Sequence, residues 1–304
     1  MPYWYILNLR TNKITLKRKK DISCKECFGI IKKKGDKNEI EYILIGEKGI
    51  IYLDQDFYEK KRRGEMDKSF IGGVKITDKL IALTSNSKLP KGEDRLVFYN
   101  IEEKKVEQTI NRSFSINLNG LALEEIKVNE TKGYKLLICA CKNYEKVNLS
   151  DNPKNLRQKK NGILLVKPKI EKDEELSYKF HDTGEFEVNC ICLINQSEYK
   201  NNTFFFFAGG LDTVRRLGMI KLFTAMYNHE KNRFNIAYLQ DIETEEINEF
   251  EGFETSIDCI LQNKNDGKIL VCSSDGKINA FSEPNLKYYI ENYEEKIAHL
   301  FEIE

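Results

Sequence analysis

Cysteine is the residue type whose spacing most directly tests for a metal site, and the chain has eight, at positions 24, 27, 139, 141, 190, 192, 259 and 272. Cys24 and Cys27 have the spacing of half a zinc site. A tetrahedral site needs a second pair of ligands at similar spacing, and the sequence has none. The cysteines therefore predict no metal site.

Two further cysteine pairs are separated by one residue, at 139 and 141 and at 190 and 192. Side chains two residues apart lie on one face of a strand. Free cysteine behaves as a small apolar side chain, so we expect these thiols to be buried in the core. A disulfide framework is rare in cytosolic proteins and is not expected here.

Histidine, the usual general base, occurs three times, as His181, His229 and His299. None of them has a cysteine, a serine or a second histidine nearby in sequence, and catalytic groups are expected as constellations. Gly209 and Gly210 are expected at a strand end, where glycine commonly makes a turn rather than a phosphate loop. We predict no catalytic residue and no cofactor, and hence no enzyme; a site assembled in the middle of the fold is the weaker alternative.

Two arginine pairs are candidate binding residues, because the planar guanidinium binds phosphate in a bidentate manner. Arg62 and Arg63 precede Gly64, and Arg215 and Arg216 lie between two expected strands. The first stretch resembles the signature of the phosphoinositide-binding propellers called PROPPINs, in which an aromatic residue or leucine precedes Arg-Arg-Gly; Arg62, Arg63 and Gly64 match it, and Lys61 departs from it. The resemblance implies that Arg62 and Arg63 bind lipid head groups. The alternative is a solvated loop in a lysine-rich chain.

Charge and hydropathy exclude several classes of partner. Lys and Arg number 49 and Asp and Glu 48, so the net charge of +1 gives no general attraction to nucleic acid. No apolar run approaches the roughly 18 residues of a membrane span. The first ten residues lack the features of a signal peptide, so we expect a cytoplasmic protein.

The segment Ser256–Phe281 reads as three short strands separated by two turns. Ile269–Cys272 is an apolar run typical of a buried strand, and Asp275-Gly276 is a strong hairpin signal. Leu270–Ile278 resembles the inner part of a blade of the WD-repeat β-propeller family, although the Trp-Asp dipeptide is absent. The resemblance implies an all-β propeller whose inner strands converge on a central channel.

The same unit recurs upstream and places five small residues in one column: Cys27, Gly73, Gly120, Cys190 and Cys259. The intervals are 46, 47, 70 and 69 residues, and the first two suit a propeller blade. The longer intervals predict insertions at 142–161, 225–232 and 241–251. The resemblance implies that small residues are needed in this column because inner strands crowd the channel.

The two ends of the chain depart from the repeat. Residues 4–9 and 14–17 predict an N-terminal hairpin that forms a partial blade, so we expect about six blades, with seven as the alternative. Leu286, Ile290, Tyr293, Ile297 and Leu300 are spaced as on one face of a helix. The expected domains are a propeller over 1–284 and a helical tail over 285–304, which packs on its own propeller or docks on a partner.

The sequence therefore favours a non-catalytic scaffold that binds other proteins through turns such as 142–161 and 211–218. The alternative function is peripheral binding to a phosphoinositide membrane surface through Arg62 and Arg63. No nucleic-acid partner and no transmembrane segment are expected.

Overall fold

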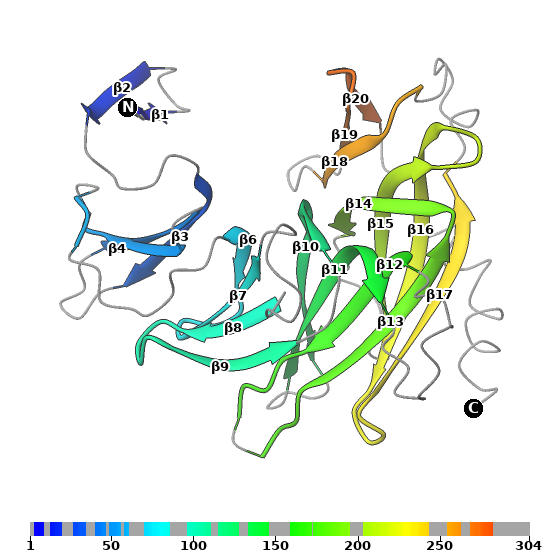
Figure 1. Ribbon diagram of the computed structural model, residues 1–304, viewed down its shortest axis with the longest axis horizontal. Helices are drawn as coiled ribbons and strands as arrows, with labels where there is room; N and C mark the ends of the chain where they lie inside the picture. Colours follow the sequence, from blue (N-terminus) through cyan, green and yellow to red (C-terminus); the bar gives the residue numbers. More distant parts are fainter. Residues whose placement is uncertain are drawn as a thin grey trace. The chain divides into compact units, whose positions relative to one another are not determined.

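The computed structural model describes residues 3–8, 13–19, 27–34, 40–46, 49–55, 58–60, 70–85, 96–110, 115–127, 133–145, 159–171, 173–194, 203–242, 254–262 and 268–281. Every helix or strand assigned in these ranges is a β-strand, which confirms the predicted all-β class for this part of the chain (Figure 1). The chain divides into two compact units, Met1–Asn111 and Arg112–Glu304, and each is described by itself.

The described residues of the first unit form three antiparallel sheets whose strands follow one another in chain order. They are β1 (Tyr3–Asn8) and β2 (Lys13–Lys19); β3 (Cys27–Lys34), β4 (Ile40–Gly46) and β5 (Gly49–Leu53); and β6 (Phe70–Lys75), β7 (Leu80–Ser85), β8 (Leu96–Asn100) and β9 (Lys105–Ile110). The β1–β2 pair confirms the predicted N-terminal hairpin.

The core of the first unit lies between the β3–β5 sheet and the β6–β9 sheet. Ile45 of β4 packs with Phe70, Leu83 and Tyr99 of the second sheet, and all four side chains are buried. The Tyr52 hydroxyl of β5 donates to the carbonyl of residue 101 at 3.4 Å, which adds a polar tie between the two sheets. Alternating apolar residues on both sheets thus face a shared core.

In the second unit, the part of the chain that the structure describes forms two sheets of four strands and one of three, again antiparallel and in chain order. They are β10 (Ser115–Lys127), β11 (Gly133–Glu145), β12 (Lys159–Lys167) and β13 (Ser177–Gly184); β14 (Phe186–Leu193), β15 (Thr203–Asp212), β16 (Leu217–Asn228) and β17 (Arg233–Asp241); and β18 (Ile257–Gln262), β19 (Ile269–Ser273) and β20 (Ile278–Phe281).

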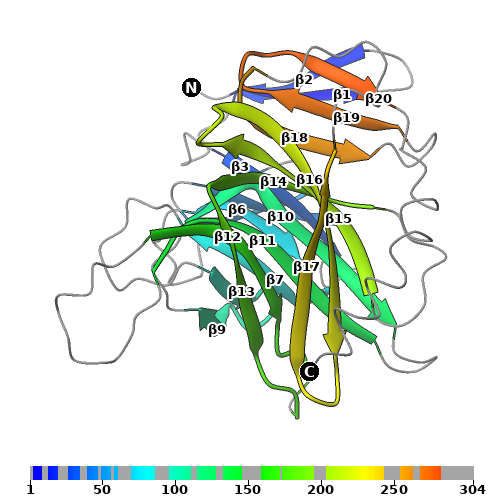
Figure 2. The ribbon, with the colours of Figure 1, turned by 90° about the vertical axis from the view of Figure 1, so that its right-hand side faces the viewer.

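The three sheets of the second unit pack face to face in succession, as Figure 2 shows. One core lies between the β10–β13 and β14–β17 sheets and is rich in aromatic rings, including Phe206 stacked on Phe223 at 5.6 Å between centroids. A second core lies between the β14–β17 and β18–β20 sheets and contains Ile257, Ile260 and Val271. The first strands β10, β14 and β18 are spatial neighbours.

The first strand of each three- or four-stranded sheet carries a register shift against the second strand. The predicted column of small residues lies in these first strands, which confirms the repeat. The residues that resume pairing after the shift are Gly29, Gly72, Leu121, Cys190 and Cys259. In the sheets that begin with β3, β6 and β10, the position is therefore displaced from the predicted Cys27, Gly73 and Gly120, and in the third of these it holds a leucine rather than a small residue. A bulge changes the direction in which the side chains of a strand point, and residue spacing in the sequence does not show where a bulge occurs.

The bulge residue of β14 links neighbouring sheets. Asn189 donates through Nδ2 to the carbonyl of Ile257 at 3.2 Å and contacts the Ser256 hydroxyl. The Cys190 thiol lies 3.7 Å from the carbonyl of Gly209 and 3.9 Å from that of Ile257. The column is thus crowded by the adjacent strand and sheet, which is a local reason for its small residues.

The prediction that Gly209 and Gly210 form a turn is wrong, because both residues are buried within strand β15 and pair with β16. A Cβ at Gly209 would lie 2.7 Å from side-chain atoms of Ile257 and Ile260. A Cβ at Gly210 would lie 1.8 Å from the carbonyl oxygen of Glu187. Glycine is required here by close approach of neighbouring backbone and side chains rather than by a turn.

The predicted insertions also need correction, because the strands are longer than expected. Within 142–161, Glu145 of β11 pairs with Lys159 of β12, and 146–158 lie outside the described residues. Within 225–232, β16 continues to Asn228, since buried Ala225 and Tyr227 keep the ladder apolar. Within 241–251, only 241 and 242 are described. The long intervals thus partly reflect strands of 12 and 13 residues.

The predicted tail helix and the domain boundary at 284 fall outside the described residues. The part of the chain that the structure describes has no helix with the length and hydrophobicity needed to cross a bilayer.

Candidate interaction surface

The predicted lipid-binding residues Arg62, Arg63 and Gly64 lie outside the described residues, so that role stays a prediction. The second arginine pair, Arg215 and Arg216, is described and lies on the turn between β15 and β16. The predicted loop 211–218 is shorter in the structure, because 211–212 and 217–218 are strand residues and only 213–216 form the turn.

The cysteines predicted to be core residues are buried. Cys139 and Cys141 are fully buried, and burial raises the pKa of both thiols. Cys190 and Cys192 are also buried, and burial raises the pKa of Cys192 to about 11. No group of three or more His, Cys, Asp or Glu in the described ranges could hold a metal ion. Cys24 is outside these ranges.

The described histidines lie apart from each other. His181 of β13 is half-buried with its ring edge-on to Phe223 at 5.9 Å between centroids. Burial, and then the charge of Lys179, lowers the pKa of His181. His229 is exposed on the β16–β17 turn, and residue 299 is outside the described ranges. The two described histidines do not meet in one site.

The β15–β16 turn is held in one conformation by Asp212. Its Oδ1 accepts hydrogen bonds from the amides of Val214 at 3.0 Å and Arg215 at 2.9 Å. Its backbone carbonyl accepts the amide of Arg216 at 2.8 Å. Arg216 has a φ of 57°, the left-handed conformation that closes the turn. The Arg215 amide also holds the pKa of Asp212 below its ordinary value.

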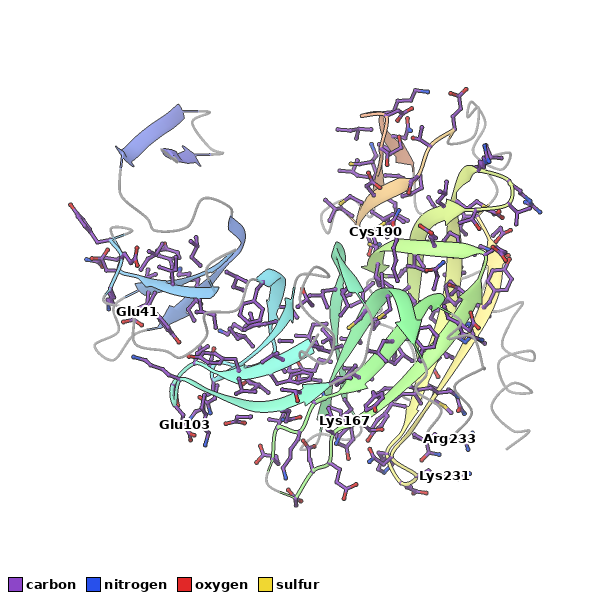
Figure 3. All side chains as sticks on the ribbon, in the orientation of Figure 1. Glu41, Glu103, Lys167, Cys190, Lys231 and Arg233 are labelled. Atoms are coloured by element: carbon purple, nitrogen blue, oxygen red, sulfur yellow. The ribbon has the colours of Figure 1, made fainter. Side chains whose placement is uncertain are left out.

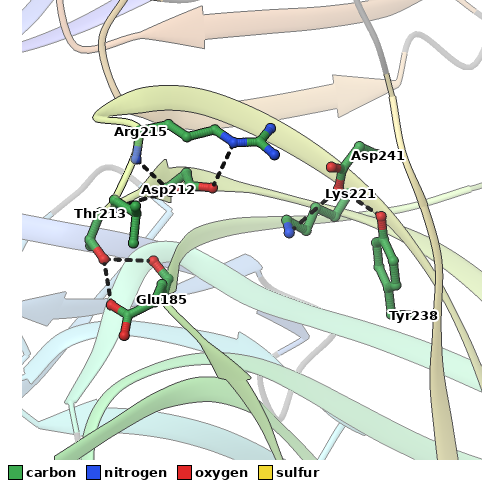
Figure 4. Close-up of polar contacts among 8 residues, drawn as sticks. Glu185, Asp212, Thr213, Arg215, Lys221, Tyr238 and Asp241 are labelled. Carbon is green, nitrogen blue, oxygen red and sulfur yellow. Dashed lines mark hydrogen bonds and ion pairs between the residues drawn. The ribbon is translucent and has the colours of Figure 1, made fainter.

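A second set of hydrogen bonds fixes the turn to the neighbouring β13–β14 turn, as Figure 4 shows. The Thr213 amide donates to the carbonyl of Glu185 at 3.0 Å. The Thr213 hydroxyl lies 2.9 Å from both the carbonyl oxygen and Oε2 of Glu185. These contacts join residues 28 positions apart, so sequence spacing gave no sign of them.

The turn presents apolar and cationic side chains together. Val214 is 72% exposed and Leu217 is 45% exposed, with Arg215 and Arg216 exposed between them. The Arg215 Nε lies 4.0 Å from Asp212 Oδ2, an exposed and therefore weak ion pair. The exposure of Val214 and Leu217 was not predicted from the sequence. The pattern that could have indicated it is their position in or next to a turn of otherwise polar residues.

Lys221 of β16 contrasts with the turn arginines because it is already engaged. Its Nζ lies 3.4 Å from Asp241 Oδ1 and over the rings of Phe186 and Tyr238 at 4.9 and 5.3 Å. The Tyr238 hydroxyl donates to the same Asp241 oxygen at 2.8 Å. This cluster supports the sheet beside the turn (Figure 4). Arg215 and Arg216, by contrast, are exposed on the turn.

Comparison with known proteins found no matching protein-family model and no matching curated protein. Among solved structures, the chain is similar to the C-terminal WD40 domain of Sif2, with 8% identity, 93% of this chain and 90% of that chain covered, and a TM-score of 0.38. It is also similar to the extracellular domain of BT4673 from B. thetaiotaomicron, with 11% identity, 91% and 43% of the two chains covered, and a TM-score of 0.29. The chain thus spans less than half of the second protein, and both TM-scores are too low to carry a conclusion about family or function.

Proposed function

We propose that the protein is a non-catalytic scaffold, built on a WD-like β-propeller, that binds another protein through the β15–β16 turn. The observation that carries the proposal is the exposure of Val214 and Leu217 beside two arginines on a turn of fixed conformation. Binding to a turn that is already ordered costs little conformational entropy. Arginine is among the side chains that most often dominate the binding energy of an interface, and neighbouring apolar contacts exclude water around it.

The propeller part of the proposal is supported by sheet order and packing. Antiparallel sheets follow one another in chain order, and each three- or four-stranded sheet repeats the bulge in its first strand. In the second unit, adjacent sheets pack face to face with their first strands as neighbours. Radial repetition of this kind builds propellers and leaves their turns available for binding.

The chemistry of the turn defines the partner. Two guanidinium groups favour carboxylates, which they bind through paired hydrogen bonds. The valine and leucine need an apolar contact that excludes water around those hydrogen bonds. We infer a partner segment in which acidic residues flank an apolar side chain.

The test compares one charge reversal at the β15–β16 turn with a matched reversal at the other end of strand β16. Tagged wild-type protein, Arg216→Glu and Lys231→Glu are used for quantitative capture from native lysate with chemical crosslinking, so that Val214 and Leu217 are kept in every form. Lys231 is exposed on the β16–β17 turn (Figure 3). Loss of an interface arginine should reduce partner recovery about tenfold, and the Lys231 variant should retain it.

Two results would overturn the proposal. One is equal recovery of every crosslinked protein by the three forms, when circular dichroism shows that all are folded. The other is turnover of a substrate that a single side-chain change abolishes.

A further inference from the structure

The adjacent strands β18 and β19 place two cysteines directly opposite each other (Figure 2). The register pairs Cys259 with Cys272, and the next pair along the ladder is Ile260 with Val271. Ile260 and Val271 are at most 2% exposed and belong to the core shared with the β14–β17 sheet. Because strand residues alternate between faces and directly paired residues share a face, the two cysteines lie together on the other face.

The separation of the two cysteines suits a disulfide bond. Residues directly opposite each other in an antiparallel pair have Cα atoms about 4.5 to 5.5 Å apart. The Cα atoms of two disulfide-bonded cysteines are usually about 4.4 to 6.8 Å apart. A bond between Cys259 and Cys272 therefore needs at most a small movement of the backbone.

The state of the two thiols also favours a reaction between them. Both cysteines are free and half-buried. Burial, and then the charge of Cys272, raises the pKa of the Cys259 thiol, so the two thiols are close enough to interact. Cys190 is the competing neighbour, because the charge of Cys259 also contributes to its raised pKa. Cys190 is fully buried in a different sheet, however, and is not paired with Cys259 in a ladder.

A peroxide supplies the oxidant that such a dithiol requires. One thiolate attacks an oxygen of hydrogen peroxide, the O–O bond breaks, and hydroxide leaves as a sulfenic acid forms. The second thiolate attacks the sulfenic sulfur, the S–S bond forms, and a second hydroxide leaves. Overall the two thiols lose two electrons and two protons, and the peroxide becomes two water molecules. A dithiol reductant cleaves the bond again by thiol–disulfide exchange.

We propose that Cys259 and Cys272 are a reversible redox pair, in which a peroxide joins β18 to β19 through a disulfide bond and a dithiol releases them. The bond closes a short loop in this hairpin and restricts the unfolded chain, which stabilises the sheet. In reducing compartments the disulfides that form are mostly transient and redox-sensing. The proposal is independent of the β15–β16 turn, so either can fail alone.

The test detects the bond between two tryptic peptides. The reduced full chain is treated with hydrogen peroxide at pH 8.5, because the raised pKa of Cys259 limits its thiolate at neutral pH. Lys264 and Lys268 lie between the cysteines, so trypsin separates them and mass spectrometry identifies a disulfide as one crosslinked species. We expect this species in wild type, its loss on treatment with dithiothreitol, and its absence from Cys259→Ser and from Cys272→Ser.

A control variant and a stability measurement accompany the mapping. Cys192→Ser removes a buried cysteine from the neighbouring sheet and should leave the crosslink unchanged. Urea unfolding should show a higher midpoint for oxidised than for reduced wild type, and no difference between the two treatments for Cys259→Ser. Fully buried Cys139 and Cys141 are the internal reference, because their alkylation by N-ethylmaleimide before digestion reports global unfolding.

Several results would overturn the proposal. They are the absence of the crosslink after peroxide treatment, a crosslink from Cys259 to Cys190 in its place, and a crosslink whose yield depends on protein concentration, because it would then join two copies. A crosslink that forms only when Cys139 becomes reactive would overturn it as well, since it would then belong to the unfolded chain. Equal urea midpoints for oxidised and reduced wild type would show that the bond does not stabilise the sheet and would also overturn it.

Discussion

At the scale of single residues, His181 links stability to pH. Burial, and then the charge of Lys179, lowers its pKa below the ordinary 6.5, so the folded state binds this proton less readily than the unfolded state. The free energy of unfolding is therefore highest above pH 6.5 with respect to this group. It falls as the pH drops from 6.5 through the lowered folded pKa, and it is constant below that value.

The prediction is that His181→Phe removes this part of the pH dependence while keeping the edge-on ring contact with Phe223. Urea unfolding at pH 7.5 and 5.0 should show a smaller loss of stability on acidification for the variant than for wild type. His229→Gln is the control for removal of an exposed histidine. An unchanged difference between the two pH values in His181→Phe would contradict the assignment.

At the scale of elements, the β14–β15 pair depends on glycine opposite the bulge. A Cβ at Gly210 would overlap the carbonyl oxygen of Glu187, which is backbone and cannot rotate away. Gly184 offers a comparison, because it has a φ of 60° but open space, with no atom within 4 Å, where a Cβ would lie. Gly210→Ala should lower the free energy of unfolding by about 3 kcal/mol through overpacking. Gly184→Ala should cost about 1 kcal/mol through backbone strain.

Urea unfolding of both glycine variants at neutral pH makes the comparison. Similar losses in the two variants would show that the β14–β15 ladder relaxes around the added methyl group, and that the close approach is not a constraint.

The same elements show which features of the fold could be predicted from the sequence and which could not. Alternation and apolar runs predicted the repeat, the N-terminal hairpin and the buried cysteines, because these depend on local patterns. Gly209 and Gly210 were predicted as a turn, since nothing in the sequence shows that a neighbouring sheet approaches them. The Thr213–Glu185 contacts and the exposure of Val214 depend on pairing between distant strands. Local patterns therefore identify strands, whereas sites formed between strands require the register.

At the scale of the whole molecule, the charge balance separates the two functions. A net charge of +1 gives no long-range attraction to an anionic membrane, so any lipid binding must come from local arginines. The protein-binding proposal uses Arg216, and the phosphoinositide alternative uses Arg62 and Arg63. The two functions therefore predict loss of binding from different variants of the same chain.

The phosphoinositide alternative predicts that wild type sediments with vesicles of phosphatidylcholine containing phosphoinositide, and that Arg62→Thr with Arg63→Thr abolishes sedimentation without changing the melting temperature. Arginine pairs bind phosphate in specific geometry, so vesicles with phosphatidylserine at equal charge should bind weakly. Lys32→Thr with Lys33→Thr removes the same charge from a different basic run and should bind as wild type. Absence of wild-type binding ends the alternative, and equal loss in both variants would reduce it to non-specific charge.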